Sequence, residues 1–183
     1  MSKKVSPIPR GYRTATPCLT VNGIDSAVAF YEAAFAAKLV TRHTGASEEA
    51  AIHATIKIGN SMIALNQEVT DQGILSPVSS GSITSQIHLY VDDVDSLWNR
   101  AIEAGAIIRN PLFDAYWGDR TGMLIDPDGH IWSIASKIEN LSQQEISNRA
   151  KPVNLYNDEE LEVPDLHAVE LAESQIQEKS IAA

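Results

Sequence analysis

Two histidines, His53 and His88, are the residues in this sequence best suited to chemistry near neutral pH. An imidazole titrates close to pH 7, so it can exchange a proton with a bound ligand or hydrogen-bond to it. They are the candidate catalytic residues. Two other interpretations stay open. One is a displaced metal site, for which two histidines without a carboxylate are poor ligands. The other is that both are satisfied polar residues lining a cavity.

The segment Tyr116-Trp-Gly-Asp-Arg120 is a second candidate site. Aromatic rings can stack on a planar ligand, and a guanidinium can hold an anion through two hydrogen bonds. We therefore expect Tyr116, Trp117 and Arg120 to contact a ligand. The alternative is that Asp119 and Arg120 pair with each other or brace the dimer and the turn.

An internal repeat positions these residues. Leu19-Thr-Val-Asn-Gly-Ile-Asp-Ser26 aligns with Leu89-Tyr-Val-Asp-Asp-Val-Asp-Ser96 at an offset of 70 residues, and the same offset aligns Gly59 with Gly129. Two distant matches at one offset indicate duplication of a supersecondary unit. The two modules are predicted at about 14–70 and 84–138.

Each module has the pattern of a strand, a helix and three further strands. Apolar and polar residues alternate over 16–21 and 86–91, which is typical of strands with one buried face. Asp25 and Asp95 follow as candidate helix N-caps, and apolar residues then recur at helical spacing. The remaining strands are predicted at 38–43, 50–58 and 61–66 in the first module, and at 107–109, 121–125 and 130–136 in the second.

Several motifs in this order resemble those of a known superfamily. Val91-Asp-Asp-Val-Asp95, Ala104-Gly-Ala106 and Asp126-Pro-Asp-Gly-His130 look like the second-module signature of the vicinal oxygen chelate superfamily, also called the glyoxalase/bleomycin-resistance/dioxygenase fold. The resemblance runs from about residue 7 to residue 149. Its closest branch looks like the PhnB-like proteins, echoed by Pro7-Ile-Pro-Arg-Gly-Tyr12, Ile52-His-Ala54, Ile58-Gly-Asn-Ser61, His88-Leu-Tyr-Val91, Gly118-Asp-Arg-Thr-Gly122 and Gly129-His-Ile-Trp132.

The resemblance implies an α+β fold. Two βαβββ modules would form a cup-shaped, barrel-like mixed sheet with helices on its outer face and the ligand on its inner face. It also implies a homodimer, because such modules commonly pair across chains. The corresponding domain would cover residues 1–149.

Alternation indicates which side chains line the cup. Thr16, Cys18 and Thr20 would face it from the first strand, and Gln86, His88 and Tyr90 from the fifth. On the third strand Ile52, Ala54, Ile56 and Ile58 would form the core set, leaving His53, Thr55 and Lys57 for the cup. A slip of one residue would bury Lys57 under a helix, which favours this register.

Enzymes that this sequence resembles usually hold a divalent ion through His, Glu or similar ligands at four positions. These positions fall here on Thr16, Ala64, Gln86 and Ser133. None carries an imidazole or a carboxylate, the donors that such an ion needs. We therefore expect no metal and no other cofactor, and we assign Thr16, Gln86 and Ser133 to ligand contact together with Cys18 and Tyr90.

The chain has 183 residues and a net charge of -10, which argues against nucleic acid or an anionic membrane as partner. Much of the acidity lies in residues 150–183, which hold 8 acidic and 2 basic residues and are predicted to form a flexible tail. A single cysteine excludes an intramolecular disulfide, and no apolar run has the length of a signal or a membrane span, so we expect a cytoplasmic protein.

Three functions follow from these features. The first is a small-molecule-binding protein that lacks the usual divalent-metal ligands. The second is a lyase or isomerase acting on a carbonyl or enolisable compound, with His53 and His88 as acid–base groups. The third is a regulatory or interaction protein that works through the acidic tail.

Overall fold

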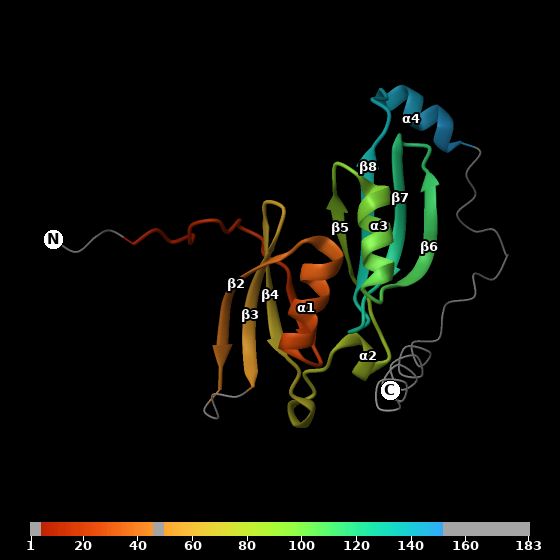
Figure 1. The fold of residues 1–183 in the computed structure, drawn as a ribbon. Helices are drawn as coiled ribbons and strands as arrows, with labels where there is room; N and C mark the ends of the chain where they lie inside the picture. The colour runs from red at the N-terminus through yellow and green to blue at the C-terminus, as the bar shows by residue number, and fades with distance from the viewer. Residues whose placement is uncertain (1–4, 46–49, 152–183) are drawn as a thin grey trace.

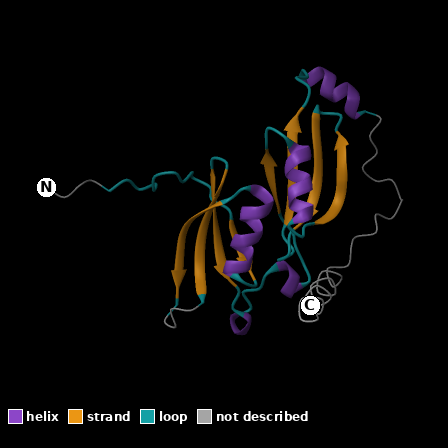
Figure 2. Cartoon of the chain, in the orientation of Figure 1, coloured by secondary structure: helices purple, strands orange, loops and turns teal. Residues whose placement is uncertain are grey.

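The computed structural model describes residues 5–45 and 50–151. The predicted acidic tail lies outside the described residues, except for its first two positions. The described chain forms an α+β fold in which each module contributes one four-stranded sheet and one long helix (Figures 1 and 2). The predicted order of a strand, a helix and three strands, occurring twice, is confirmed.

The first module consists of β1 (Cys18–Val21), α1 (Ile24–Phe35), β2 (Lys38–Thr44), β3 (Ala51–Ile58) and β4 (Ser61–Gln67). The second consists of β5 (Gln86–Tyr90), α3 (Val94–Glu103), β6 (Ile107–Asp114), β7 (Asp119–Ile125) and β8 (Ile131–Lys137). A short 3-10 turn (Thr70–Gln72) and α2 (Pro77–Ser80) join them, and α4 (Gln143–Ala150) follows.

The two sheets have the same topology. Their strand orders are β1-β4-β3-β2 and β5-β8-β7-β6. The pairs β1–β4 and β5–β8 are parallel, and the other pairs are antiparallel. In the described part of the chain the sheets are not hydrogen-bonded to each other, so β1 and β5 are open edges and no closed barrel forms. Helices α1 and α3 cover the same side of the molecule and contact each other (Figure 1).

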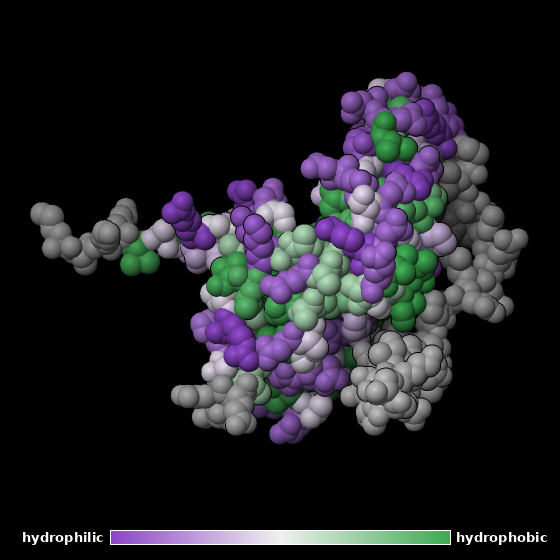
Figure 3. All heavy atoms as spheres, in the orientation of Figure 1, coloured by the Kyte–Doolittle hydropathy of each residue, from purple (hydrophilic) through white to green (hydrophobic). Residues whose placement is uncertain are grey.

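The core lies between the helices and the sheets. Leu19 and Val21 are buried on β1 while Cys18 is exposed, as the alternation predicts. On the surface that carries α1 and α3, the end of the second module around α4 is mostly hydrophilic, whereas hydrophobic side chains show over the first module (Figure 3). None of the helices in the described ranges is both long and apolar enough to span a bilayer.

Two local predictions are wrong. Gly23 and Asp93, rather than Asp25 and Asp95, occupy the N-cap positions, and the Asp93 carboxylate accepts a hydrogen bond from the Ser96 amide at 3.0 Å. The two predicted residues lie in the first helical turns instead, where a negative charge is also favourable.

Ile52 is the second exception. It is 52% exposed, whereas Ala54, Ile56 and Ile58 are buried as predicted. The register between β2 and β3 shifts at this point, because His43 is opposite His53 and the next residue, Thr44, is opposite Ala51. A bulge of this kind interrupts the alternation, and the extra residue leaves the core face.

The five-residue turn between β7 and β8 joins the modules. The Asp126 carboxylate is buried and accepts hydrogen bonds from the Tyr31 hydroxyl on α1 (2.7 Å), the Trp132 indole (2.7 Å) and the His130 amide (2.8 Å). Burial raises the pKa of Asp126, although these donors and the neighbouring His130 act in the opposite direction. A buried polar cluster with satisfied partners fixes one arrangement of the groups that form it.

The same turn holds the end of β1. The Asp128 carboxylate accepts a hydrogen bond from the backbone N–H of Asn22 at 2.7 Å. The His130 Nε2 lies 2.9 Å from the Thr20 carbonyl oxygen, so this nitrogen carries the proton and donates it. We call these contacts, together with those of Asp126, the inter-module staple.

Candidate functional site

The face of the second sheet away from α3 is the candidate ligand-binding face, and we call it the open face. Gly122 on β7 faces the helix, since a Cβ built on it would lie 2.6 Å from the Trp98 ring of α3. Its neighbours Thr121 and Met123 must therefore point to the other side of the sheet.

Strand register extends this assignment across the sheet. One row of the open face runs Tyr90–Ala135–Thr121–Phe113, and the next runs His88–Ser133–Met123–Asn110. The first row has small side chains in its centre and an aromatic ring at each end. The two central side chains are almost fully buried, Ala135 at 0% and Thr121 at 6% exposed, so a ligand on this face would contact mainly the two rings. We call these four residues the Tyr90–Phe113 row.

His88 lies in the row next to the Tyr90–Phe113 row. Its Nδ1 is 2.8 Å from the Ser133 hydroxyl oxygen, and its ring packs edge-on against Tyr90 at 4.7 Å between centroids. The predicted catalytic residue His88 and the predicted ligand residues Tyr90 and Ser133 are thus brought together. Among the described residues nothing hydrogen-bonds to His88 Nε2, so this nitrogen can interact with a ligand.

Asp119 organises one end of the open face. It is 1% exposed, and its Oδ2 accepts hydrogen bonds from the Tyr90 hydroxyl and the Trp117 indole, both at 2.7 Å. The Lys137 ammonium lies 3.1 Å from Oδ1. Burial alone would raise the pKa of Asp119, but the hydrogen bonds from Tyr90, Lys137 and Trp117 outweigh burial and lower this pKa. The hydrogen bond between Tyr90 and Asp119 also raises the pKa of Tyr90.

The predicted aromatic loop joins this group. Trp117 packs edge-on against Tyr116 at 4.9 Å and against Phe113 at 6.3 Å between ring centroids. Because Trp117 is tied to Asp119, the loop is held over the end of the open face. Phe113 and Asp119 were not among the predicted site residues. A buried carboxylate in a strand and the parity of Phe113 are the signals that point to them.

Arg120 lies elsewhere. It has the parity of Gly122 and therefore lies on the helix face, where its guanidinium bonds Asp95 on α3 (2.8 Å) and Asp114 on β6 (3.0 Å). The alternative interpretation, a pair between Asp119 and Arg120, is also wrong, since each has other partners. Arg120 braces α3 against the edge of the sheet and is not brought to the open face with Tyr90 and Trp117.

The first sheet carries the other predicted residues. A row on its open side runs Thr20–Asn66–His53–His43, with the two imidazole rings 5.8 Å apart. The Asn66 amide donates to the Cys18 thiol sulfur at 2.8 Å, and the Tyr12 hydroxyl lies 3.3 Å from that of Thr55. His53 and His88 therefore lie on different sheets with different neighbours.

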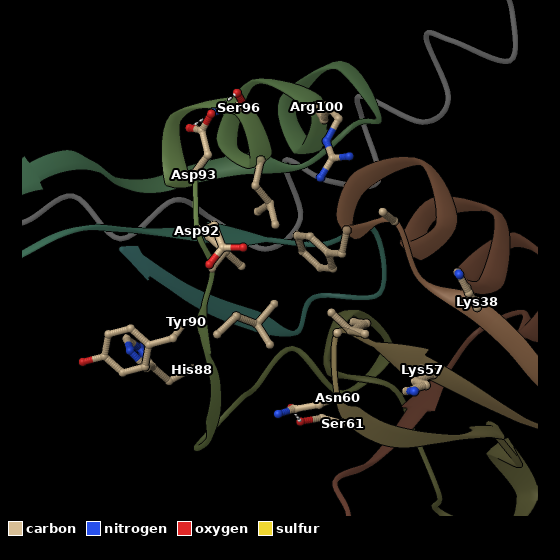
Figure 4. A pocket seen from close by; sticks show the side chains of 17 residues that line it. Lys38, Lys57, Asn60, Ser61, His88, Tyr90, Asp92, Asp93, Ser96 and Arg100 are labelled. Carbon is tan, nitrogen blue, oxygen red and sulfur yellow. Dashed lines mark hydrogen bonds between the residues drawn. The ribbon is translucent and has the colours of Figure 1, made fainter. Parts of the chain in front are cut away.

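A cleft of about 990 Å³ separates the modules beside the open edge of β5 (Figure 4). Its first-module wall includes Lys38, Lys57 and the β3–β4 turn, and its second-module wall includes β5 and the start of α3. His88 and Tyr90 belong to both the cleft and the open face, so the two spaces meet along β5.

The family model of the Glyoxalase/Bleomycin resistance protein/Dioxygenase superfamily matches residues 13–134. The chain belongs to this superfamily. A Mycobacterium tuberculosis protein, Rv0887c, is 37% identical over 134 residues, which cover 72% of this chain and 78% of that one.

Two solved structures share this fold. TioX from Micromonospora sp. ML1 superposes with a TM-score of 0.54 at 24% identity, covering 71% of this chain and all of TioX. The fosfomycin resistance protein FosX from Listeria monocytogenes, solved with Mn(II) and 1S,2S-dihydroxypropylphosphonic acid, gives a TM-score of 0.54 at 15% identity, covering 76% and 96% of the two chains. At these identities the likeness concerns the fold.

The usual metal positions of the superfamily do not fit a divalent ion here. Thr16 precedes β1, Ala64 is opposite Cys18, and Gln86 begins β5 beside Ile131. The fourth position, Ser133, has its hydroxyl engaged by His88. A methyl, an amide and two hydroxyls lack the imidazole and carboxylate donors of such sites. Over residues 5–45 and 50–151, no group of three His, Cys, Asp or Glu side chains gathers to replace them.

Proposed function

We propose that this superfamily member binds a small molecule on the open face of its second sheet, without a divalent ion at the usual positions. The observation that carries the proposal is the pair of exposed aromatic rings at the two ends of the Tyr90–Phe113 row. Ala135 and Thr121 lie between Tyr90 and Phe113, with the His88–Ser133 pair in the adjacent row. Exposed aromatic rings beside a few polar groups are common components of a ligand site.

We further propose that the protein is a member of the PhnB-like branch and acts as a cytoplasmic homodimer. A second copy completes the binding cup, which is supported by the edge strands β1 and β5, since neither pairs with a strand of the other module in the described residues. Light scattering coupled to size-exclusion chromatography tests the dimer, and a monomeric mass at micromolar concentration would reject it.

The binding proposal is tested with a panel of metabolites and antibiotics, first by ligand-induced thermal shift and then by calorimetry. Phe113→Ala removes one of these two rings, and Ile108→Ala is its matched control. Both residues are exposed on β6, but Ile108 is opposite Leu124 and lies on the helix face. We expect the first variant to weaken binding about tenfold or more, equivalent to about 1.4 kcal/mol, and the second to leave it unchanged. Equal effects of both variants would contradict the proposal.

An enzymatic function is the second candidate, favoured by the imidazole of His88. Ser133 holds its Nδ1, which leaves Nε2 for proton transfer to a carbonyl or enolisable compound. In this case a bound compound would be converted, and His88→Ala would abolish conversion while the far-ultraviolet circular dichroism spectrum stayed unchanged. Binding without conversion supports the first candidate. Conversion that survives His88→Ala rejects the second.

A further inference from the structure

The cleft and the inter-module staple lie at equivalent positions of the two copies of the repeat. The staple joins the modules at one of these positions, and the cleft lies at the other. At the offset of 70 residues, Thr20 and Asn22 correspond to Tyr90 and Asp92, and Gly129 corresponds to Gly59. The end of β1 is bound by the β7–β8 turn, whereas the end of β5 faces the β3–β4 turn across open space.

Turn length explains the difference. Five residues separate β7 from β8, and they include the Asp126, Asp128 and His130 side chains that reach the other module. Only Gly59 and Asn60 separate β3 from β4. A two-residue turn has neither the length nor the carboxylates to cross to β5, so the duplicated unit closes at one end and stays open at the other.

Cationic side chains from both modules line the open end. Lys38 and Lys57 are directly opposite each other on β2 and β3, and Arg100 projects from α3 on the other wall (Figure 4). Within the described ranges none of these three makes an ion pair at 4 Å or less. Four of the other basic residues do: Arg42, Arg120, Lys137 and Arg149.

All three side chains are exposed, so solvent screens part of their repulsion, and a bound anion would remove the remainder. Two like charges directly opposite each other on neighbouring strands are destabilising. Two acidic residues do line the cleft, but Asp93 is engaged at the N-terminus of α3 by Ser96, which leaves Asp92 as the remaining carboxylate.

We propose that the cleft binds a small organic polyanion, one with two or more carboxylate or phosphate groups, between Lys38 and Lys57 of one module and Arg100 of the other. Asn60 and Ser61 supply additional polar contacts from the β3–β4 turn. The bound anion joins the modules at the end where the staple is missing. This site goes beyond the proposed function, because it does not require the open face to bind anything.

The test uses pyrophosphate and citrate, two polyanions of different chemistry, in calorimetric titrations of the full chain at low ionic strength. Lys57→Gln and Arg100→Gln each remove one charge from opposite walls. Arg109→Gln on β6 removes the same charge outside the cleft and serves as the control. We expect each cleft variant to weaken binding of at least one polyanion about fivefold or more, and the control less than about twofold.

Thermal unfolding of each variant without ligand verifies that it is folded. Failure of both anions to bind saturably up to about 10 mM would overturn the proposal. So would equal losses in Arg109→Gln, which would mean that only the overall charge matters. Loss in Lys57→Gln without loss in Arg100→Gln would reject the bridging of two modules. Phe113→Ala should leave polyanion binding unchanged, so failure of the open face and failure of the cleft are distinguishable.

Discussion

Replacing Asp119 by Asn tests whether this carboxylate organises the end of the open face. The change keeps the shape of the side chain and one acceptor oxygen, but it removes the charge that Tyr90, Trp117 and Lys137 surround. Hydrogen bonds to a charged group contribute roughly 1.5–3 kcal/mol, and those to a neutral group about 1 kcal/mol. The loss of charge assistance in two such bonds gives a destabilisation of about 2 kcal/mol. The half-exposed Lys137 adds little.

This loss should appear as a decrease in the melting temperature of about 4–8 °C, since a chain of this size loses about 2–4 °C for each kcal/mol. The assay is thermal and urea unfolding of Asp119→Asn beside Asp71→Asn, which alters an exposed carboxylate in the 3-10 turn. The control should change the free energy of unfolding by less than about 0.5 kcal/mol.

The pH dependence gives a second check. The pKa of Asp119 is lower in the folded chain than its ordinary value. Its ionised form therefore adds stability at neutral pH, and this contribution is lost as the pH falls below about 4 and through the folded pKa. The difference between the parent and Asp119→Asn should shrink over the same range. The role assigned to Asp119 would be refuted by a difference in stability that stays constant down to about pH 3. Equal stabilities of the parent and Asp119→Asn at pH 7 would refute it as well.

Tyr31→Phe keeps the aromatic packing but removes one buried hydrogen bond to Asp126, so the free energy of unfolding should fall by about 1–3 kcal/mol. The pKa of Asp126 is raised in the folded chain, so its ionised form costs stability above about pH 4, and the cost of this variant should grow with pH in urea titrations. Gly122→Ala places a Cβ 2.6 Å from the Trp98 ring and should destabilise by about 1–3 kcal/mol, seen as an earlier thermal transition. Ser142→Ala removes the N-cap of α4, which buries no side chain, so hydrogen exchange should accelerate in this helix alone, by about 1 kcal/mol of local stability.

Alternation was sufficient to predict much of the second sheet. It places His88 and Tyr90 on one side of β5, and the structure brings them together with Ser133. The same rule, applied to β7, separates Asp119 from Arg120, because adjacent residues of a strand point to opposite faces. The prediction that Arg120 contacts a ligand treated Asp119 and Arg120 as parts of one loop. The partners of Arg120, Asp95 and Asp114, lie on the helix face.

Alternation fails where the backbone inserts a residue. At Ile52 the bulge between β2 and β3 moves an apolar side chain out of the core. The helix α4 was missed for a different reason, because its signal is a capping box formed by Ser142 and Glu145 rather than an apolar stripe. The sequence contains this signal, but a helix without a buried face leaves no hydrophobic periodicity.

The sequence by itself determined the duplicated unit, its strand and helix order, and the residue types at the four usual metal positions. These are local properties, because period, caps and turns depend on neighbours along the chain. Only the tertiary structure decided what the two copies do differently. The five-residue turn before β8 carries Asp126, Asp128 and His130 to the other module, and the two-residue turn before β4 leaves a cleft lined by Lys38, Lys57 and Arg100. Contacts between residues about 100 positions apart depend on how the modules pack, which no local pattern records.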